Sequence, residues 1–261
     1  MAGHNKWSKI KHRKAVVDKR RGKVWTKCAR ALMSAARQGG ADPSANVTLR
    51  YAIDEARYAN MPKDTIERAI QKGVGDVGAD DWEPVRYEGY GPSGVAVLVD
   101  ALTNNRARTV TDLRLIFEKH GGNLGNAGCV GYMFETRGRI AALQGNRSAD
   151  TMLEIAIESG ADDVQAPEPA SDPDDEPEES ESVWTILTRP AEFQAVKEAL
   201  EAAGVSIVEA ELAMIPGTTV EPPIESALGV IRLTEALDDN DDVQKVYHNA
   251  LISDEAMSRA D

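Results

Sequence analysis

The chain has 261 residues, of which 42% are apolar and 28% charged, and its formal net charge is −13. This length is enough for two or three domains that each bury a core. No apolar run approaches the roughly 20 residues that cross a bilayer, and no apolar stretch follows the first lysines as in a secretory signal. The isolated cysteines, Cys28 and Cys129, are typical of small side chains in a reducing compartment. We therefore expect a cytoplasmic protein with no membrane partner.

The charge is divided unevenly along the chain. Residues 1–38 hold twelve Lys or Arg against the single acid Asp18, a balance of +11. The other 223 residues hold 18 bases and 42 acids, a balance of −24. A basic end on an acidic chain indicates that this end contacts nucleic acid.

The first 75 residues predict three helices. Apolar residues recur at helical spacing from 23 to 38, ahead of two glycines, and again from about 44 to 59. A third helix is expected from about 60 to 73, with Pro62 in its first turn. Gly73, Gly75 and Gly78 then form a GxGxxG pattern. Because this pattern follows a helix rather than a strand, we interpret it as a linker and not as a dinucleotide site.

Strands and helices alternate beyond residue 83. We expect strands at 85–90 and 95–101 across a turn, and a helix at 105–119. A glycine-rich stretch at 121–131 and a strand at 132–135 follow. The next elements are a strand at 139–143, a helix at 149–159, a short strand near 164, a strand at 183–187, a helix at 191–203 and a strand at 205–212. A helix at 224–237 and a strand or short helix at 243–252 end the chain.

This order predicts an α+β fold of three domains. Residues 1–79 form a basic arm and a helical domain. Residues 80–136 plus 211–261 form a discontinuous ferredoxin-like α/β domain, with strands expected at 132–135 and near 213. A second ferredoxin-like domain, 137–210, is inserted in it and has the β-α-β, β-α-β order of that fold. Its acidic loop, 162–181, holds ten acids, four prolines and no base, which is typical of a solvated segment.

The sequence shows no catalytic or metal-binding pattern. Ser93 lies in GPSGV and not in GxSxG, and the four histidines lack ligand spacing. Asp238, Asn240 and Asp242 resemble the start of a calcium loop, but Val243 occupies the position that requires Gly. We expect no catalytic residue, no metal, no cofactor and no small-molecule substrate, and therefore no enzyme.

Two cationic segments are the candidate nucleic-acid-binding sites. The first segment runs from residue 6 to residue 30. Its cations can neutralise phosphates, and the rings of Trp7 and His12 can stack on unpaired bases. The alternative is that Trp7 anchors the arm to the core. The candidate residues of this segment are Lys6, Trp7, Lys9, Lys11, His12, Arg13, Lys14, Lys19, Arg20, Arg21, Lys23, Lys27 and Arg30.

The second segment, 103–109, lies at the start of a predicted helix. Asn104, Arg106 and Arg108 there can bind an anion together with free backbone N–H groups of the helix end. The alternative is that Thr103 or Asn104 is only an N-cap and the arginines are exposed. Lys119, His120 and Asn123 could join a contact surface from elsewhere in the fold.

Four segments in order along the chain carry a family resemblance. They are residues 3–14 (GHNKWSKIKHRK), 59–70 (ANMPKDTIERAI), 87–92 (YEGYGP) and 119–125 (KHGGNLG), and VYHN at 246–249 extends the match. These motifs resemble the YebC/PmpR family, which includes the translational activator of cytochrome c oxidase subunit I. The resemblance implies three domains and a non-enzymatic role. Members are described as DNA-binding transcriptional regulators and as ribosome-associated translation factors that relieve stalling.

We therefore expect a monomeric, ribosome-associated translation factor that binds rRNA through its basic N-terminus. The alternative is a transcriptional regulator of double-stranded DNA, although the predicted helix at 62–72 mixes acids with bases and makes a poor major-groove face. A third interpretation, an enzyme that uses the turn at 87–94 with Asn104 or His120, has the least support.

Overall fold

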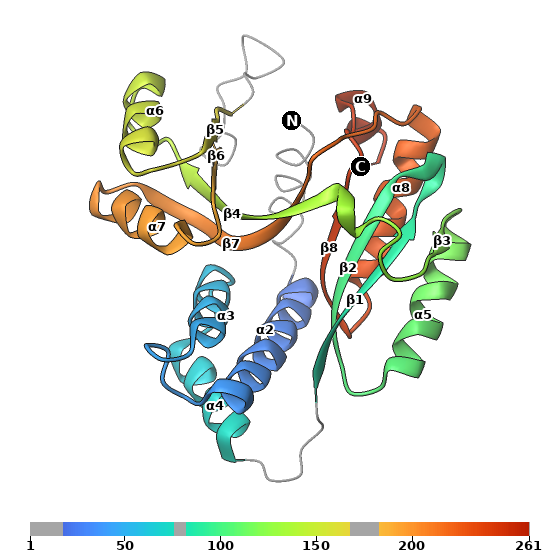
Figure 1. The fold of residues 1–261 in the computed structure, drawn as a ribbon, viewed down its shortest axis with the longest axis horizontal. Coiled ribbons are helices and arrows are strands. Elements are labelled where there is room, and N and C mark those ends of the chain that lie inside the picture. Colours follow the sequence, from blue (N-terminus) through green and yellow to red (C-terminus); the bar gives the residue numbers. More distant parts are fainter. Residues whose placement is uncertain (1–17, 76–81, 168–182, 261) are drawn as a thin grey trace. The chain divides into compact units, whose positions relative to one another are not determined.

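The computed structural model describes residues 18–75, 82–167 and 183–260, which form helices and two antiparallel sheets (Figure 1). The chain divides into two compact units. The first unit comprises Met1–Glu135 and Pro216–Asp261, and the second comprises Thr136–Ile215. The α+β class predicted from the sequence is confirmed, as is a helical N-terminal part that precedes the sheets.

Three helices form the N-terminal part of the first unit: α2 (Asp18–Gly39), α3 (Val47–Tyr58) and α4 (Lys63–Gly75). Their shared core includes the fully buried Leu32 and Leu49. The buried Asn46 begins α3, where its side chain accepts a hydrogen bond from Leu49 N at 3.0 Å and donates one to Ala35 O at 2.8 Å. One amide thus caps α3 and ties it to α2, as expected for Asn at an N-cap.

Gly73, which the sequence placed in a linker, lies inside α4. A Cβ at this position would lie 2.5 Å from Met33 O on α2, which is closer than real Cβ contacts. Glycine therefore allows α4 to approach the backbone of α2 closely. Gly75 ends α4, and Gly78 lies outside the described residues.

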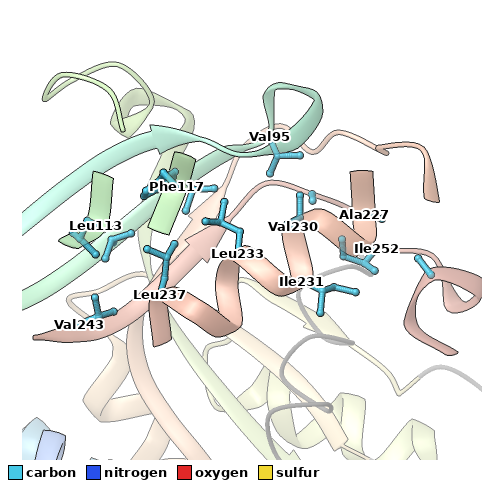
Figure 2. Close-up of a cluster of buried hydrophobic side chains, with 14 of the residues drawn as sticks. Val95, Leu113, Phe117, Ala227, Val230, Ile231, Leu233, Leu237, Val243 and Ile252 are labelled. Carbon is cyan, nitrogen blue, oxygen red and sulfur yellow. The ribbon is translucent and has the colours of Figure 1, made fainter. Parts of the chain in front are cut away.

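The first sheet has the strand order β3-β1-β2-β8. Its elements are β1 (Glu83–Tyr90), β2 (Ala96–Thr103), α5 (Arg106–Lys119), β3 (Asn123–Leu124), α8 (Ile224–Asp238), β8 (Val243–His248) and the short α9 (Asp254–Ser258). The hairpin of β1 and β2 is confirmed, with Tyr90 opposite Ala96. Figure 2 shows the core of this part, in which Leu113 and Phe117 of α5 meet Val230, Leu233 and Leu237 of α8.

The second sheet has the order β5-β6-β4-β7. Its elements are β4 (Phe134–Leu143), α6 (Ala149–Glu158), β5 (Asp163–Gln165), β6 (Val183–Thr188), α7 (Phe193–Ala202) and β7 (Ser206–Pro216). Two β-α-β halves with this strand order make the split unit of a ferredoxin-like fold, as the sequence predicted. Most of the acidic loop, residues 168–182, lies outside the described residues.

Two strand assignments from the sequence are wrong. Residues 132–135 are not a strand of the first sheet: a short helix, η2 (Gly131–Met133), leads into β4, which continues without a break to Leu143. The segment near 213 also belongs to the second sheet, as part of β7. The first sheet is completed by two other strands. β1 pairs with β2 across a short turn, and the two-residue β3 pairs with the other edge of β1.

Candidate nucleic-acid interface

Most of the predicted basic arm lies outside the described residues. This applies to Lys6, Trp7, Lys9, Lys11, His12, Arg13 and Lys14. Lys19, Arg20 and Arg21 lie in the first turns of α2, and their side chains are also outside the described part. The contribution of these ten residues to binding therefore stays a prediction.

Further along α2, two predicted cations contact the acidic C-terminal end of α8. Lys23 Nζ lies 3.0 Å from Asp239 Oδ1, and Lys27 Nζ donates to Asp238 O at 2.6 Å. Lys23 and Asp239 expose 45% and 72% of their side chains, so their pair contributes about 0–1 kcal/mol at most. A phosphate could replace such a carboxylate at little cost in free energy.

Arg30, one α-helical turn beyond Lys27, has a more fixed position. Its guanidinium donates to Asp241 O, lies 4.0 Å from the Asp242 carboxylate and stacks 4.6 Å from the centre of the Trp82 ring. A cation over an indole face is attracted by the negative ring face. Arg30 therefore joins α2 to the start of β1 and to the turn before β8.

The start of α5 is capped, as in the alternative interpretation of this segment, but the N-cap is Asn105 and not Thr103 or Asn104. Asn105 is the N-cap, since its Oδ1 accepts from Arg108 N at 3.1 Å, and Thr103 Oγ1 accepts from Asn105 N at 2.9 Å. The Asn104 side chain accepts from the Arg108 guanidinium at 3.1 Å. These short polar side chains satisfy N–H groups that a helix start leaves unpaired.

Both predicted arginines of this segment have carboxylate partners in the chain. Arg106 donates to Glu83 at 2.7 Å, and Arg108 donates to Asp242 at 2.8 Å. Thr109 also donates to Asp242, at 2.7 Å. An anion bound at this helix start would have to take the place of the Asp242 carboxylate.

Asp242 is 4% exposed and ionised. Burial by itself would raise the pKa of its carboxyl, but the hydrogen bonds from Arg108 and Thr109 outweigh burial and hold the pKa below its usual value. This carboxylate lies within reach of both α5 and, through Arg30, α2. The two predicted cationic segments thus meet at one buried anion of the protein itself.

Lys119, His120 and Asn123 lie at the opposite end of α5. Lys119 is the last residue of the helix, His120 is its C-cap and Asn123 begins β3. Burial, helped by Lys119 and Arg232, lowers the pKa of His120, so this ring is neutral at pH 7. Fourteen residues at about 1.5 Å each separate the helix ends by about 20 Å, so the fold does not bring these residues to the 103–109 segment.

Glu88 organises the glycine-rich stretch, which the sequence did not reveal. Its carboxylate accepts hydrogen bonds from the backbone N–H groups of Gly128, Val130 and Gly131, and its carbonyl accepts one from Gly125. Tyr90, on the same strand, donates to Cys129 O at 3.0 Å. The motif YEGYGP therefore acts as a structural support for the loop that precedes β4.

A cleft of about 740 Å³ lies along α2 and α4 and was also missed. Trp25, Ala29 and Met33 of α2 line it, together with Met61 and Trp82. Their spacing on α2, four residues apart, is a second apolar stripe beside the buried Cys28, Leu32 and Ala35. That extra stripe is the signal in the sequence that could have revealed this surface.

Two other kinds of site are absent from the part of the chain that the structure describes. No helix there is long and apolar enough to cross a membrane. Within the same residues, no group of three or more His, Cys, Asp or Glu side chains could hold a metal ion.

The described residues define an α+β chain in which a helical segment with a cationic face precedes two four-stranded antiparallel sheets. Family models match nearly all of it: residues 5–76 match the TACO1/YebC protein N-terminal domain, and residues 82–250 match the TACO1/YebC second and third domain. The chain belongs to the TACO1/YebC family, and the resemblance seen in the sequence motifs is confirmed.

Relatives match over their full lengths. A probable transcriptional regulatory protein of Idiomarina loihiensis is 47% identical over 261 residues, which is 100% of both chains. One from Persephonella marina is 47% identical over 260 residues, or 99% of each chain. The crystal structure of a conserved hypothetical protein from Aquifex aeolicus superposes with a TM-score of 0.79 at 45% identity, covering 91% of this chain and 93% of that one.

Proposed function

We propose that this chain is a non-enzymatic, nucleic-acid-binding regulator of gene expression. The observation that carries the proposal is the charge balance of +11 in residues 1–38 against −24 in the rest. Phosphate binding by Lys and Arg releases condensed counterions, which favours binding even when the whole protein is acidic. The regulatory names of the full-length relatives agree with this proposal.

Within this class we propose a cytoplasmic, monomeric translation factor that associates with the ribosome and relieves stalling. Residues 6–30 would bind rRNA, and the α/β domains would position the protein. The proposed three domains are 1–79, 80–135 with 216–261, and 136–215, so that β7 up to Ile215 stays within the inserted domain. No cofactor is required, because the protein would act by stabilising a productive geometry.

The contacts between α2 and the end of α8 support an exchange of partners on binding. Lys23 and Lys27 contact Asp239 and Asp238, and the exposed Lys23–Asp239 pair is of the weakly stabilising kind. RNA phosphates would replace the acidic end of α8 on this helix face. The acidic body, which repels phosphate, would limit contact to one orientation.

The test is charge reversal in the arm. Changing Lys9, Lys11, Arg13 and Lys14 to Glu should abolish co-sedimentation with ribosomes and reduce the slope of log affinity against log salt by roughly 3, at about 0.7 per phosphate of a single strand. Unchanged association would contradict the proposal. A matched control reverses four exposed cations outside the arm: Arg57, Lys63, Arg68 and Arg259. This control should co-sediment as the wild type does.

The second candidate is a transcriptional regulator that binds duplex DNA, which the printed names of the relatives favour. The exposed residues of α4 include Lys63 and Arg68 but also Asp64 and Glu67, so this helix offers a mixed face to a major groove. A footprint on promoter DNA that survives excess unrelated DNA and RNA would establish this function in place of the first.

A further inference from the structure

The cleft along α2 and α4 combines aromatic walls with a cationic rim. Its apolar lining includes Trp25 and Met33 from α2, Met61 before α4, and Trp82 before β1. The volume of about 740 Å³ lies in the range of roughly 300–1,000 Å³ that is usual for small-ligand sites. All of these residues belong to the first unit.

The charged residues of the cleft all have one sign. Arg30, Arg37 and Lys72 line it, and none of the described lining residues is Asp or Glu, although the Asp242 carboxylate lies 4.0 Å from Arg30 behind the lining. Two of these three cations come from the basic segment 1–38, so the cleft extends the positive end of an otherwise acidic chain. The cleft therefore selects an occupant that is negatively charged and has flat apolar faces.

Contacts at the edges hold the aromatic walls in place. The indole N–H of Trp25 donates to Ala59 O at 2.9 Å, and the guanidinium of Arg30 lies 4.6 Å from the centre of the Trp82 ring. At the floor, Gly73 allows α4 to lie against Met33. A site whose rings are already fixed loses little side-chain entropy when a ligand binds.

We propose that this cleft binds one unpaired nucleotide of single-stranded RNA. The base would stack between the rings of Trp25 and Trp82 and the neighbouring Met side chains of the lining, and Lys72 and Arg37 would bind the adjacent phosphates. Aromatic side chains and Arg planes are the usual partners of unstacked bases in single-stranded RNA. The inference rests on the proposed function and adds to it a base-stacking site that is separate from the arm.

The cleft also has hydrogen-bonding groups for the edge of a base. Thr26, Ser34 and Gln38 line it, and hydroxyl and amide side chains can both donate and accept. Such groups can pair with any base, so the cleft would tolerate different sequences. A stacking site of this kind distinguishes unpaired from paired RNA, because a base inside a duplex offers no free face.

The first test removes one aromatic wall. Trp82→Leu should weaken binding of a fluorescein-labelled decauridine by roughly ten- to a hundred-fold, as measured by fluorescence anisotropy, and leave the salt slope unchanged. The matched control is Tyr132→Leu, since Tyr132 is 78% exposed in the same unit but does not line the cleft. This control should bind as the wild type does. If Trp82→Leu and the wild type bind decauridine equally well, the proposal that the cleft binds a base is wrong.

The second test needs no aromatic change and so keeps the proposal falsifiable if Trp82→Leu unfolds. Lys72→Gln should weaken decauridine binding and lower the salt slope by about 0.7, whereas Lys63→Gln on the same helix, outside the cleft, should do neither. Equal effects of the two lysine variants would refute a phosphate contact at Lys72.

Further comparisons distinguish binding in the cleft from binding by the basic arm, and RNA from DNA as the ligand. If reversal of the arm residues abolishes ribosome binding while both cleft variants bind decauridine normally, the proposed function stands and the cleft is wrong. If the wild type binds no RNA, both fail. If Trp82→Leu loses binding of oligothymidine but not of decauridine, the ligand of the cleft is DNA and not RNA. If this variant still binds an abasic strand as the wild type does, the lost contact is stacking on the base.

Discussion

The carboxylate of Glu88 should be the main support of the glycine-rich stretch between α5 and β4. Its Oε1 accepts from Gly128 N at 2.8 Å, and its Oε2 accepts from Val130 N at 2.8 Å and Gly131 N at 2.6 Å. Glu88 is buried, with only 8% of its surface exposed. Glu88→Gln keeps the shape of this side chain but replaces one acceptor oxygen by an NH2 group.

The geometry bounds the cost of this substitution. The amide oxygen of Gln can still accept from Val130 N and Gly131 N, but the NH2 group then faces the N–H of Gly128. The Gly128 N–H loses its acceptor, which costs about 1–3 kcal/mol. The two remaining bonds become neutral and about half as strong. We expect the free energy of unfolding to fall by about 2–4 kcal/mol, which lowers the melting temperature by roughly 5–15 °C for a unit of this size.

Thermal unfolding at neutral pH, followed by circular dichroism, measures this loss, and hydrogen exchange should show faster exchange at Gly128, Val130 and Gly131. The matched control is Glu83→Gln on the same strand. Glu83 is paired with Arg106 on the surface, and its loss should leave the melting temperature nearly unchanged. Equal melting temperatures for Glu88→Gln and the wild type would refute the role of the carboxylate.

The pH dependence gives an independent check. Burial raises the pKa of Glu88, but the three backbone N–H bonds outweigh burial and hold the pKa below its usual value. The stabilisation is therefore complete above the ordinary Glu pKa of about 4.3 and is lost as the pH falls through the folded-state pKa. The wild type should approach Glu88→Gln in stability in acid. A difference that stays constant with pH would mean that shape rather than charge matters.

Two further substitutions test other buried polar groups. Asp242→Asn should lower the free energy of unfolding, measured by urea denaturation, by about 1–3 kcal/mol, because Arg108 and Thr109 lose a charged acceptor. Asp239→Asn, at the surface, should leave this free energy unchanged. Burial lowers the pKa of His248 to about 4. Stability should therefore fall from about pH 6.5 toward pH 4 by up to about 1.4 kcal/mol per pH unit, since only the unfolded chain binds the proton. An unchanged slope in His248→Gln would contradict this assignment.

Periodicity alone predicted most elements, because it reports local geometry. The helical spacing of Cys28, Leu32 and Ala35 identified α2, and two apolar runs around Gly91 identified the hairpin of β1 and β2. The order of strands and helices in residues 139–212 likewise indicated the ferredoxin-like sheet. These elements are specified by neighbours in sequence, so the sequence carries their signal.

Strand pairing was not predictable in the same way. The edge strand β3 has only two residues, Asn123 and Leu124, which is too short for any alternation to appear. Residues near 213 have an apolar pattern that fits either sheet, and only packing assigned them to β7. A pattern shows which face of a strand is buried, but it does not show which strand lies beside it.

The sequence by itself determined that the cations concentrate at one end, that the body is acidic and that the chain is α+β. Only the tertiary structure decided what those cations contact. Lys23 meets Asp239 across 216 positions, and Arg108 meets Asp242 across 134. The physical reason is that charge and periodicity are properties of local sequence, whereas an ion pair, a fixed indole or a cleft needs segments that folding brings together from distant positions.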